Sequence, residues 1–131
     1  MAVRAKQFRY AVALERGGIV TADGASPLEL DEAWTPEHLV LAGLVRCTLQ
    51  SLRFHADREG VDFVASGSAS ALVTKREPND RYAFVAIEVD LEVELDPQPS
   101  DRDALFASAE RDCFVGASLT AKPQYTWRVI G

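Results

Sequence analysis

The fold is decided by one continuous stretch, residues 35–60, which reads TPEHLVLAGLVRCTLQSLRFHADREG. Thr35 is a good helix N-cap, the proline after it fits the first helical position, and Glu37 lies where the helix dipole favours a negative charge. Gly60 suits the C′ position that ends a helix. Residues 39–45 are apolar on every side, which predicts a central helix that is buried on most sides. In a chain this small, a second subunit is an obvious source of the protein needed around it.

The segments on either side of this helix have the period-two alternation and the turn residues of β-strands. The paired glycines Gly17 and Gly18 supply the positive φ that a tight hairpin needs. Ser100 and Asp103 resemble a capping box that opens a second helix. The expected strands are residues 7–14, 19–21, 28–32, 61–75, 81–95 and 125–130, with a turn at 77–80 and a second helix that ends at about Cys113. This order predicts one α+β domain, βββ-α-ββ-α-β, over residues 1–131.

The strand expected at residues 81–95 is the most regular of these. In its second half, from Val85 to Leu95, Val, Ile and Leu alternate with Ala, Glu and Asp. One face of the strand should therefore lie in the core, and the acidic face at residues 88–94 should be solvated. A metal site on that acidic face is the less favoured interpretation.

Length and composition exclude several classes of protein. With 131 residues, of which 47% are hydrophobic and 26% charged, the chain is neither disordered nor fibrous. A formal net charge of −6 argues against non-specific binding to nucleic acid or to an anionic membrane surface. The basic N-terminal residues are not followed by the apolar core of a signal peptide, and the longest uncharged run in the first half of the chain is far short of the ~20 residues that span a bilayer. We therefore expect a cytoplasmic protein, whose cysteines are kept reduced.

Two cysteines, Cys47 and Cys113, are too few for a disulfide-stapled scaffold and supply only half of a tetrahedral zinc site. Position alone favours Cys47 as a buried, inert thiol. The N-terminus of its helix is about 18 Å away, so a reactive Cys47 would need a nearby Arg or Lys to stabilise the thiolate. His38 and His55 lie more than two helical turns away and cannot act as its base within the helix. Gly43, one turn before Cys47, either admits a packed neighbour or leaves room for a substrate.

Several motifs together resemble those of the OsmC/Ohr family of osmotically inducible and organic-hydroperoxide-resistance proteins. Residues 35–47 form the pattern Thr-Pro-Glu-x-Leu-x-x-Ala-Gly-x-x-x-Cys, and the segment CFVGASL begins at Cys113, after a helix that contains Glu110. A turn with Arg16 followed by two glycines lies near the N-terminus, and a β-hairpin separates the two helices. The resemblance covers almost the whole chain.

This resemblance implies a thiol peroxidase that works as an intertwined homodimer, without cofactor or metal, and with each active site at the subunit interface. Cys47 would be the peroxidatic thiolate that attacks an organic hydroperoxide and becomes a sulfenic acid. Cys113 would resolve it as a disulfide, which a small or lipoyl-type dithiol then reduces. Arg16 matches the arginine that stabilises the thiolate, and Glu37 matches the carboxylate that holds this arginine in place.

Departures from the family pattern leave alternatives open. Phe114 stands where many members have proline, and Arg46 stands where a small residue is common. The loop after Arg16 is shorter than in the hydroperoxide-resistance branch, which makes Arg9 the reserve candidate for the activating cation. Trp34 is either a pocket residue or a structural one. Two other functions remain in view: a non-catalytic homodimer that binds a small apolar ligand, and a redox sensor whose disulfide alters a partner surface.

Overall fold

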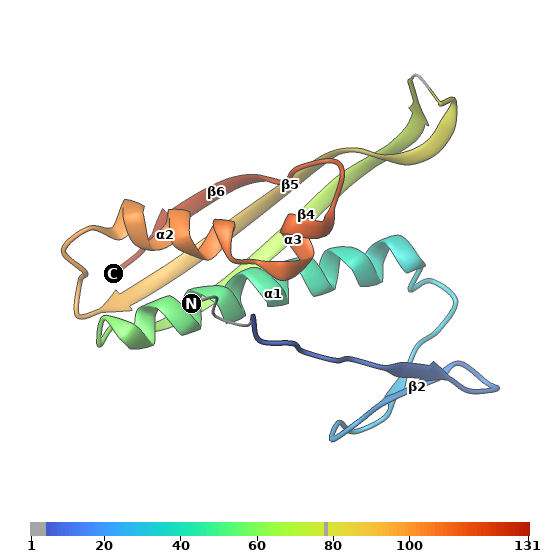
Figure 1. Ribbon diagram of the computed structural model, residues 1–131, viewed down its shortest axis with the longest axis horizontal. Helices are drawn as coiled ribbons and strands as arrows, with labels where there is room; N and C mark the ends of the chain where they lie inside the picture. The colour runs from blue at the N-terminus through green and yellow to red at the C-terminus, as the bar shows by residue number, and fades with distance from the viewer. Residues whose placement is uncertain (1–4, 78) are drawn as a thin grey trace. The chain divides into compact units, whose positions relative to one another are not determined.

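The computed structural model describes residues 5–77 and 79–131, and it consists of two compact units (Figure 1). The first unit ends at Pro36, and the second runs from Glu37 to Gly131. The observed elements confirm the α+β class, with three short strands before the long helix and the remaining strands after it. The extent of one domain over residues 1–131 stays a prediction.

The first unit contains a small antiparallel sheet in the order β1-β2-β3. Its strands are β1 (Val12–Leu14), β2 (Ile19–Ala22) and β3 (Leu28–Glu29). The turn between β1 and β2 contains Gly17 at φ +86° and Gly18 at φ +87°. Residues other than glycine seldom adopt such positive φ values, so the predicted glycine turn is confirmed.

The predictions for two of these strands, at residues 7–14 and 28–32, were too long. Pairing between β1 and β2 begins at Val12, which lies opposite Ala22. The chain then turns at Gly24, whose φ is +74°, so β2 does not continue alongside the residues that precede Val12. Within the described residues, the strand pairing of this sheet starts at Val12, so residues 7–11 do not form part of a strand.

Three large apolar side chains of this small sheet lie on one face. Leu14 pairs with Val20, and Val20 pairs with Leu28, so the three side chains project from the same face. Leu14 and Leu28 are exposed. The first unit therefore does not cover its own apolar face.

The second unit is built on a three-stranded sheet in the order β4-β5-β6 (Figure 1). β4 (Asp62–Arg76) and β5 (Arg81–Asp96) form a long antiparallel hairpin with a register shift between Leu72 and Val73. β6 (Gln124–Val129) pairs with β5 in parallel. In the turn between β4 and β5, Asp80 has a φ of +57°, and Pro78 of the predicted turn lies outside the described residues.

Three helices accompany this sheet. α1 (Pro36–Arg58) precedes β4, while α2 (Arg102–Arg111) and α3 (Phe114–Ser118) form the crossover that a parallel β5–β6 pair requires. The predicted N-cap of the second helix is wrong. Its N-cap is Asp101, not Ser100, because the Asp101 carboxylate accepts a hydrogen bond from the Ala104 amide at 3.0 Å. It ends before Cys113, which instead caps α3, so the observed order is βββ-α-ββ-αα-β.

The core of the second unit lies between β5 and the helices. Alternate β5 residues from Ile87 to Leu95 are buried, as the alternation predicted, and they form one cluster with Leu44 and Leu52 of α1 and Leu105 of α2. The intervening acidic residues lie on the other face, where all but the half-buried Glu92 are exposed. One face of the sheet thus supports both long helices.

The bounds of α1 confirm the prediction, since Gly60 follows the helix at a φ of +70°. The prediction that α1 is buried on most sides is wrong for the single chain. The sheet and α2 cover one side, which carries Leu44 and Leu52. Leu39 and Phe54 remain 40% and 57% exposed.

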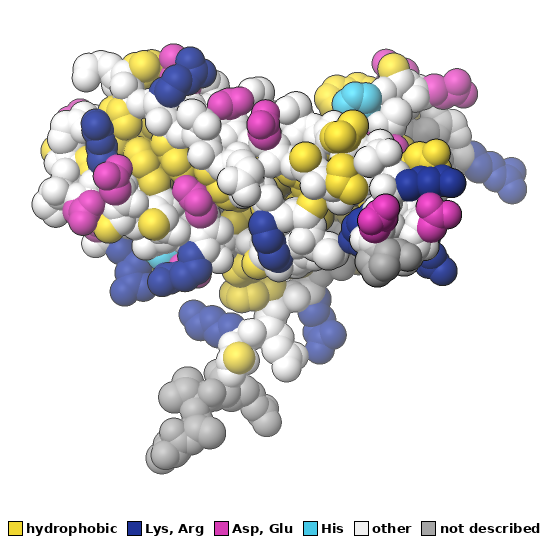
Figure 2. Space-filling view, turned by 90° about the horizontal axis from the view of Figure 1, so that it is seen from above, with side chains coloured by type: hydrophobic (Ala, Val, Ile, Leu, Met, Phe, Trp, Pro, Cys, Tyr) yellow, Lys and Arg dark blue, Asp and Glu magenta, His cyan; other side chains and the backbone are white. Residues whose placement is uncertain are grey.

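The surface carries charges of both signs. On the face drawn in Figure 2, basic and acidic side chains are interspersed, with hydrophobic side chains between them. Within the described ranges, no helix is both long enough and apolar enough to cross a lipid bilayer.

Candidate functional site

Two thiols meet beside α3. Cys47 lies in the middle of α1, is partly exposed, and its Sγ accepts a hydrogen bond from the Val115 amide at 3.5 Å. Cys113 is fully buried at the N-cap of α3, and its Sγ accepts a hydrogen bond from the Gly116 amide at 3.4 Å. Both sulfurs are free thiols. Consecutive amides of one short helix therefore face the two sulfurs.

The surroundings of Cys47 favour the neutral thiol in the single chain. Burial is the main cause that raises the pKa of Cys47, and the neighbouring Cys113 thiol raises it further. Backbone amides of Val115 and Phe114 lower this pKa, with smaller effect than burial. Among the described residues that shift the pKa of Cys47, none is a cation. The influence of Cys113 on this pKa also shows that the two thiols interact.

Cys113 is surrounded by hydroxyl groups as well as by the Gly116 amide. Thr48 Oγ1 lies 3.5 Å from Cys113 Sγ, 2.9 Å from the Leu44 carbonyl oxygen and 3.4 Å from Tyr125 Oη. Burial is the main cause that raises the pKa of Tyr125 to about 12, so the phenol stays protonated at neutral pH. In the sequence, the only signal for Thr48 is its position next to Cys47. No local pattern links Tyr125, 12 residues after Cys113, to either thiol.

The glycines beside the two thiols differ in the space around them. A Cβ placed on Gly43 would meet no atom within 4 Å, so in the single chain this position is open. A Cβ on Gly116 would lie 3.1 Å from Tyr125 Oη and 3.5 Å from Cys113 Sγ. The missing side chain at Gly116 lets the phenol and the buried thiol share one small space.

Each of the other predicted site residues has a place within its own unit. Arg16 is exposed in the turn between β1 and β2, and Arg9 is exposed before β1, where it donates a hydrogen bond to Gln7 at 3.4 Å. Glu37 is exposed in the first turn of α1, about 15 Å from Cys47 along the helix axis. The structure brings Cys47 and Cys113 together, and the roles of the two arginines and of Glu37 stay predictions.

His55 has a structural partner. Its Nε2 lies 2.7 Å from Asp112 Oδ2, which ties α1 to the residue just before Cys113. Two hydrogen bonds from Arg111 are the main cause that lowers the pKa of Asp112 to about 2, and His55 lowers it further. In the described part of the chain, no group of three or more His, Cys, Asp or Glu side chains could hold a metal ion.

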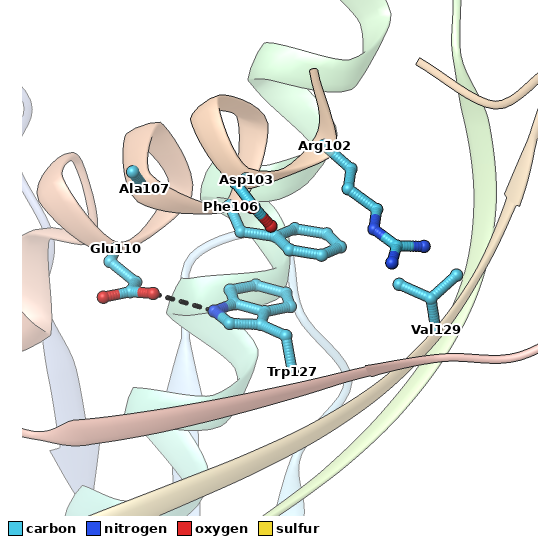
Figure 3. A pocket seen from close by; sticks show the side chains of 7 residues that line it. All are labelled: Arg102, Asp103, Phe106, Ala107, Glu110, Trp127 and Val129. Atoms are coloured by element: carbon cyan, nitrogen blue, oxygen red, sulfur yellow. Dashed lines mark hydrogen bonds between the residues drawn. The ribbon is translucent and has the colours of Figure 1, made fainter. Parts of the chain in front are cut away.

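A pocket of about 380 Å³ lies between α2 and β6 (Figure 3). Phe106 stacks on Trp127 with ring centroids 4.3 Å apart, and Trp127 Nε1 donates a hydrogen bond to Glu110 at 2.8 Å. Arg102 and Val129 close the other end, and neither cysteine lines the pocket. Trp127 also stacks on Tyr125, with centroids 6.4 Å apart, so this aromatic group supports the phenol beside Cys113.

Solved structures with the same fold belong to OsmC-like and organic hydroperoxide resistance proteins. An OsmC-like protein of unknown function from Vibrio cholerae has a TM-score of 0.72 at 12% identity, covering 96% of this chain and 100% of that one. An organic hydroperoxide resistance protein from Legionella pneumophila has a TM-score of 0.61 at 17% identity, covering 97% and 100%. The protein OhrB of Bacillus subtilis, also named for organic hydroperoxide resistance, has a TM-score of 0.55 at 18% identity, covering 93% and 96%.

Sequence comparison identifies the family. No curated protein matches the chain, and at identities below one fifth the structural likenesses establish the fold alone. The family model of the OsmC-like proteins, however, matches residues 28–128, which include both cysteines. The chain therefore belongs to the OsmC-like protein family, as its motifs predicted.

Proposed function

We propose that this protein is a dithiol-dependent peroxidase that reduces organic hydroperoxides. The observation that carries the proposal is the meeting of Cys47 and Cys113, which lie 66 residues apart in the sequence and accept hydrogen bonds from consecutive amides of α3. Membership of the OsmC-like family supports it, as does the shared fold with organic hydroperoxide resistance proteins from Legionella pneumophila and Bacillus subtilis.

In the first step, the Cys47 thiolate attacks one oxygen of the hydroperoxide. An S–O bond forms as the O–O bond breaks, so the sulfur is oxidised to a sulfenic acid and the alkoxide leaves, taking up a proton to become an alcohol. The partial exposure of Cys47 and the open position at Gly43 leave room for an apolar substrate.

In the second step, the Cys113 sulfur attacks the oxidised Cys47 sulfur. The S–S bond forms as the S–O bond breaks, and the hydroxide leaves with the proton of the Cys113 thiol as water. A small or lipoyl-type dithiol then reduces the disulfide by two thiol–disulfide exchanges and itself becomes a disulfide. The cycle uses only thiol and peroxide chemistry.

The first step needs a cation, because burial raises the pKa of Cys47 and so disfavours the thiolate. We assign this role to Arg16, with Arg9 as the alternative, and assign the orientation of the guanidinium to Glu37. An exposed guanidinium on the glycine turn is free of packing that would prevent its approach to a thiol. A cation within about 4–6 Å lowers a pKa by roughly 1–3 units, enough to offset a moderate burial effect.

A homodimer would complete this site. The exposed Leu39 and Phe54 of α1, together with the exposed Phe114 beside the thiols, give an apolar surface that a second copy would cover. We propose that the two copies pair through α1, that each site lies at their interface, and that the enzyme acts in the cytoplasm, where dithiol reductants keep it active.

The experiment is stopped-flow consumption of cumene hydroperoxide or tert-butyl hydroperoxide in the presence of a dithiol. Cys47→Ser should lower the rate by roughly a thousandfold or more, because the nucleophile is gone. Arg16→Ala should lower it by roughly a hundredfold and Arg9→Ala far less, since only the activating cation changes the thiolate fraction. Equal slow rates for the native protein and Cys47→Ser would sink the peroxidase proposal.

The raised pKa of Cys47 in the single chain favours a second candidate, a non-catalytic homodimer in which the thiols are core residues. Titration of Cys47 distinguishes the two candidates, with reaction against iodoacetamide followed as a function of pH. A measured pKa at or above the ordinary thiol value of 9.0, with no disulfide to Cys113 after peroxide treatment, would select the non-catalytic protein.

A further inference from the structure

Cys113 is enclosed by groups that can donate hydrogen bonds to its sulfur. It is 0% exposed, so solvent cannot stabilise a negative charge there. The Gly116 amide and the Thr48 hydroxyl both lie within 3.5 Å of Cys113 Sγ, and the Tyr125 hydroxyl also interacts with it. A buried sulfur that must become a nucleophile needs such donors, because an unpaired buried charge is costly.

Thr48 has one hydroxyl proton and more than one acceptor. While Cys113 is a thiol, the Thr48 hydroxyl donates its hydrogen bond to the Leu44 carbonyl oxygen, its shortest contact at 2.9 Å. The lone pairs of Thr48 Oγ1 are then open to donors, and both the Cys113 thiol at 3.5 Å and the Tyr125 hydroxyl at 3.4 Å can donate to them. The Leu44 carbonyl belongs to α1 and also accepts a backbone hydrogen bond within the helix, so it does not depend on Thr48.

When Cys113 loses its proton, rotation about the Thr48 Cβ–Oγ1 bond turns the hydroxyl proton of Thr48 from the Leu44 carbonyl toward the Cys113 sulfur. The Tyr125 hydroxyl still donates to Thr48, so both hydroxyls then point along one chain toward Cys113. Hydrogen bonds aligned in this way strengthen one another. Rotation of the O–H bond is sufficient for this change, because Thr48 Oγ1 already lies 3.5 Å from Cys113 Sγ and 3.4 Å from Tyr125 Oη.

We propose that the Thr48 hydroxyl is a catalytic residue for the resolving thiol, donating to Cys113 as its sulfur attacks oxidised Cys47, with Tyr125 as the positioning residue that orients Thr48. This inference rests on the proposed function, in which Cys113 forms the disulfide. The balance is unchanged: the S–S bond forms, the leaving group departs from Cys47, and the proton of Cys113 leaves with it.

The test uses a leaving group that does not depend on peroxide. Cys47 is converted to a mixed disulfide with thionitrobenzoate at acidic pH, and a pH jump then starts the attack of Cys113, which releases thionitrobenzoate as a coloured product. A parallel arm replaces this reagent with cumene hydroperoxide and traps the sulfenic acid with dimedone for mass spectrometry.

Thr48→Val should release thionitrobenzoate roughly tenfold to a hundredfold more slowly than the native protein, since a hydrogen bond to a charged group is lost. Tyr125→Phe should show a smaller loss in the same direction, and Thr48→Ser should restore most of the rate because it keeps the hydroxyl. The deficit of Thr48→Val should narrow as the pH rises, since the thiolate then forms without help. A purely structural role for Thr48 would produce no such pH dependence.

Ser118→Ala is the matched control, since it removes an exposed hydroxyl of α3 that donates to the Phe114 carbonyl at 2.8 Å and does not face Cys113. Release from Thr48→Val at the native rate, or no release from the native protein, would overturn the inference. If the native protein releases thionitrobenzoate but hydroperoxide does not oxidise Cys47, the proposed function fails and the inference stands.

Discussion

The two thiols share one short helix but have contrasting surroundings. Cys47 is partly exposed, accepts a hydrogen bond from the Val115 amide, and lies one helical turn from the open position at Gly43. Cys113 is fully buried and is contacted by the Gly116 amide, the Thr48 hydroxyl and the Tyr125 hydroxyl. Cys47 Sγ is accessible to solvent but has few hydrogen-bond donors, whereas Cys113 Sγ has several donors and is not accessible.

This difference shows how a small domain can separate two chemical demands. A sulfur that meets an external substrate must be reachable, while a sulfur that attacks only its neighbour is better held in a fixed, dry position. α3 serves both, because its successive amides face different sulfurs. Among the described residues that shift the pKa of Cys47, none is a cation, so the cation assigned to this thiol stays a proposal.

The largest expected effect is on thiol reactivity. Cys113→Ser retains only the partly exposed Cys47 thiol, and Cys47→Ser retains only the buried Cys113 thiol. The Cys113 thiol should react with a thiol reagent at least roughly a hundredfold more slowly than the Cys47 thiol, because it reacts only after local opening of the structure. The measurement is the pseudo-first-order rate with Ellman's reagent. Both variants should react at similar rates in denaturant, and similar rates in the folded state would refute the contrast in access.

A smaller effect is expected from adding a methyl group beside each thiol, at Gly43 near Cys47 and at Gly116 near Cys113. Gly43→Ala should raise the free energy of unfolding by about 0.5–1 kcal/mol, because alanine favours the helix and its Cβ meets nothing. Gly116→Ala should not give this gain, since its Cβ would press on Tyr125 Oη at 3.1 Å. Urea unfolding at one fixed protein concentration measures both. Destabilisation by Gly43→Ala would mean that a second chain occupies the space beside Cys47.

The smallest effect concerns the link between α1 and the residue before Cys113. The pKa of Asp112 is lowered from 3.8 to about 2, chiefly by Arg111 and then by His55. A depressed carboxyl pKa contributes stability that is present above pH about 4 and is lost as the pH falls toward 2. Because the side chain is 41% exposed, solvent screening limits this contribution to a few tenths of a kcal/mol.

Asp112→Asn should therefore lower the unfolding free energy slightly at pH 6 and by much less near pH 2. Urea unfolding at both values measures the change. Asp57→Asn, at an exposed position of α1 whose carboxylate lies 3.7 Å from Arg53, serves as the control for loss of a surface charge. A deficit of Asp112→Asn that persists undiminished at pH 2 would show that the carboxylate charge is not its cause.

The sequence predicted the fold where its signals are local. The cap at Thr35 and the glycine at position 60 placed α1 correctly, and the alternation along β5 identified the buried residues from Ile87 to Leu95. The predictions were wrong where contacts between distant parts of the chain determine the extent of a strand or the burial of a helix. The pattern at residues 7–14 is that of a strand, but strand pairing begins only at Val12. The apolar pattern of α1 predicted burial on most sides, but Leu39 and Phe54 are exposed in the single chain.

The site could be predicted only in part. Cys47 and Cys113 emerged from motif spacing, and the structure shows that they meet. Thr48 and Tyr125 could not be found this way, because a common threonine in a helix and a tyrosine in a strand carry no signal of a contact over 77 residues. Such a contact follows from the parallel pairing of β6 with β5, which sequence periodicity does not specify.

That pairing has a consequence for folding order. α2 and α3 form the crossover between β5 and β6, so Cys113 and Tyr125 reach α1 only through contacts between distant parts of the chain. Non-local pairings of this kind form slowly, since the intervening loop must close first. The two thiols meet where α3 lies against α1, so the rate at which a mild oxidant joins them during refolding measures when the crossover reaches α1.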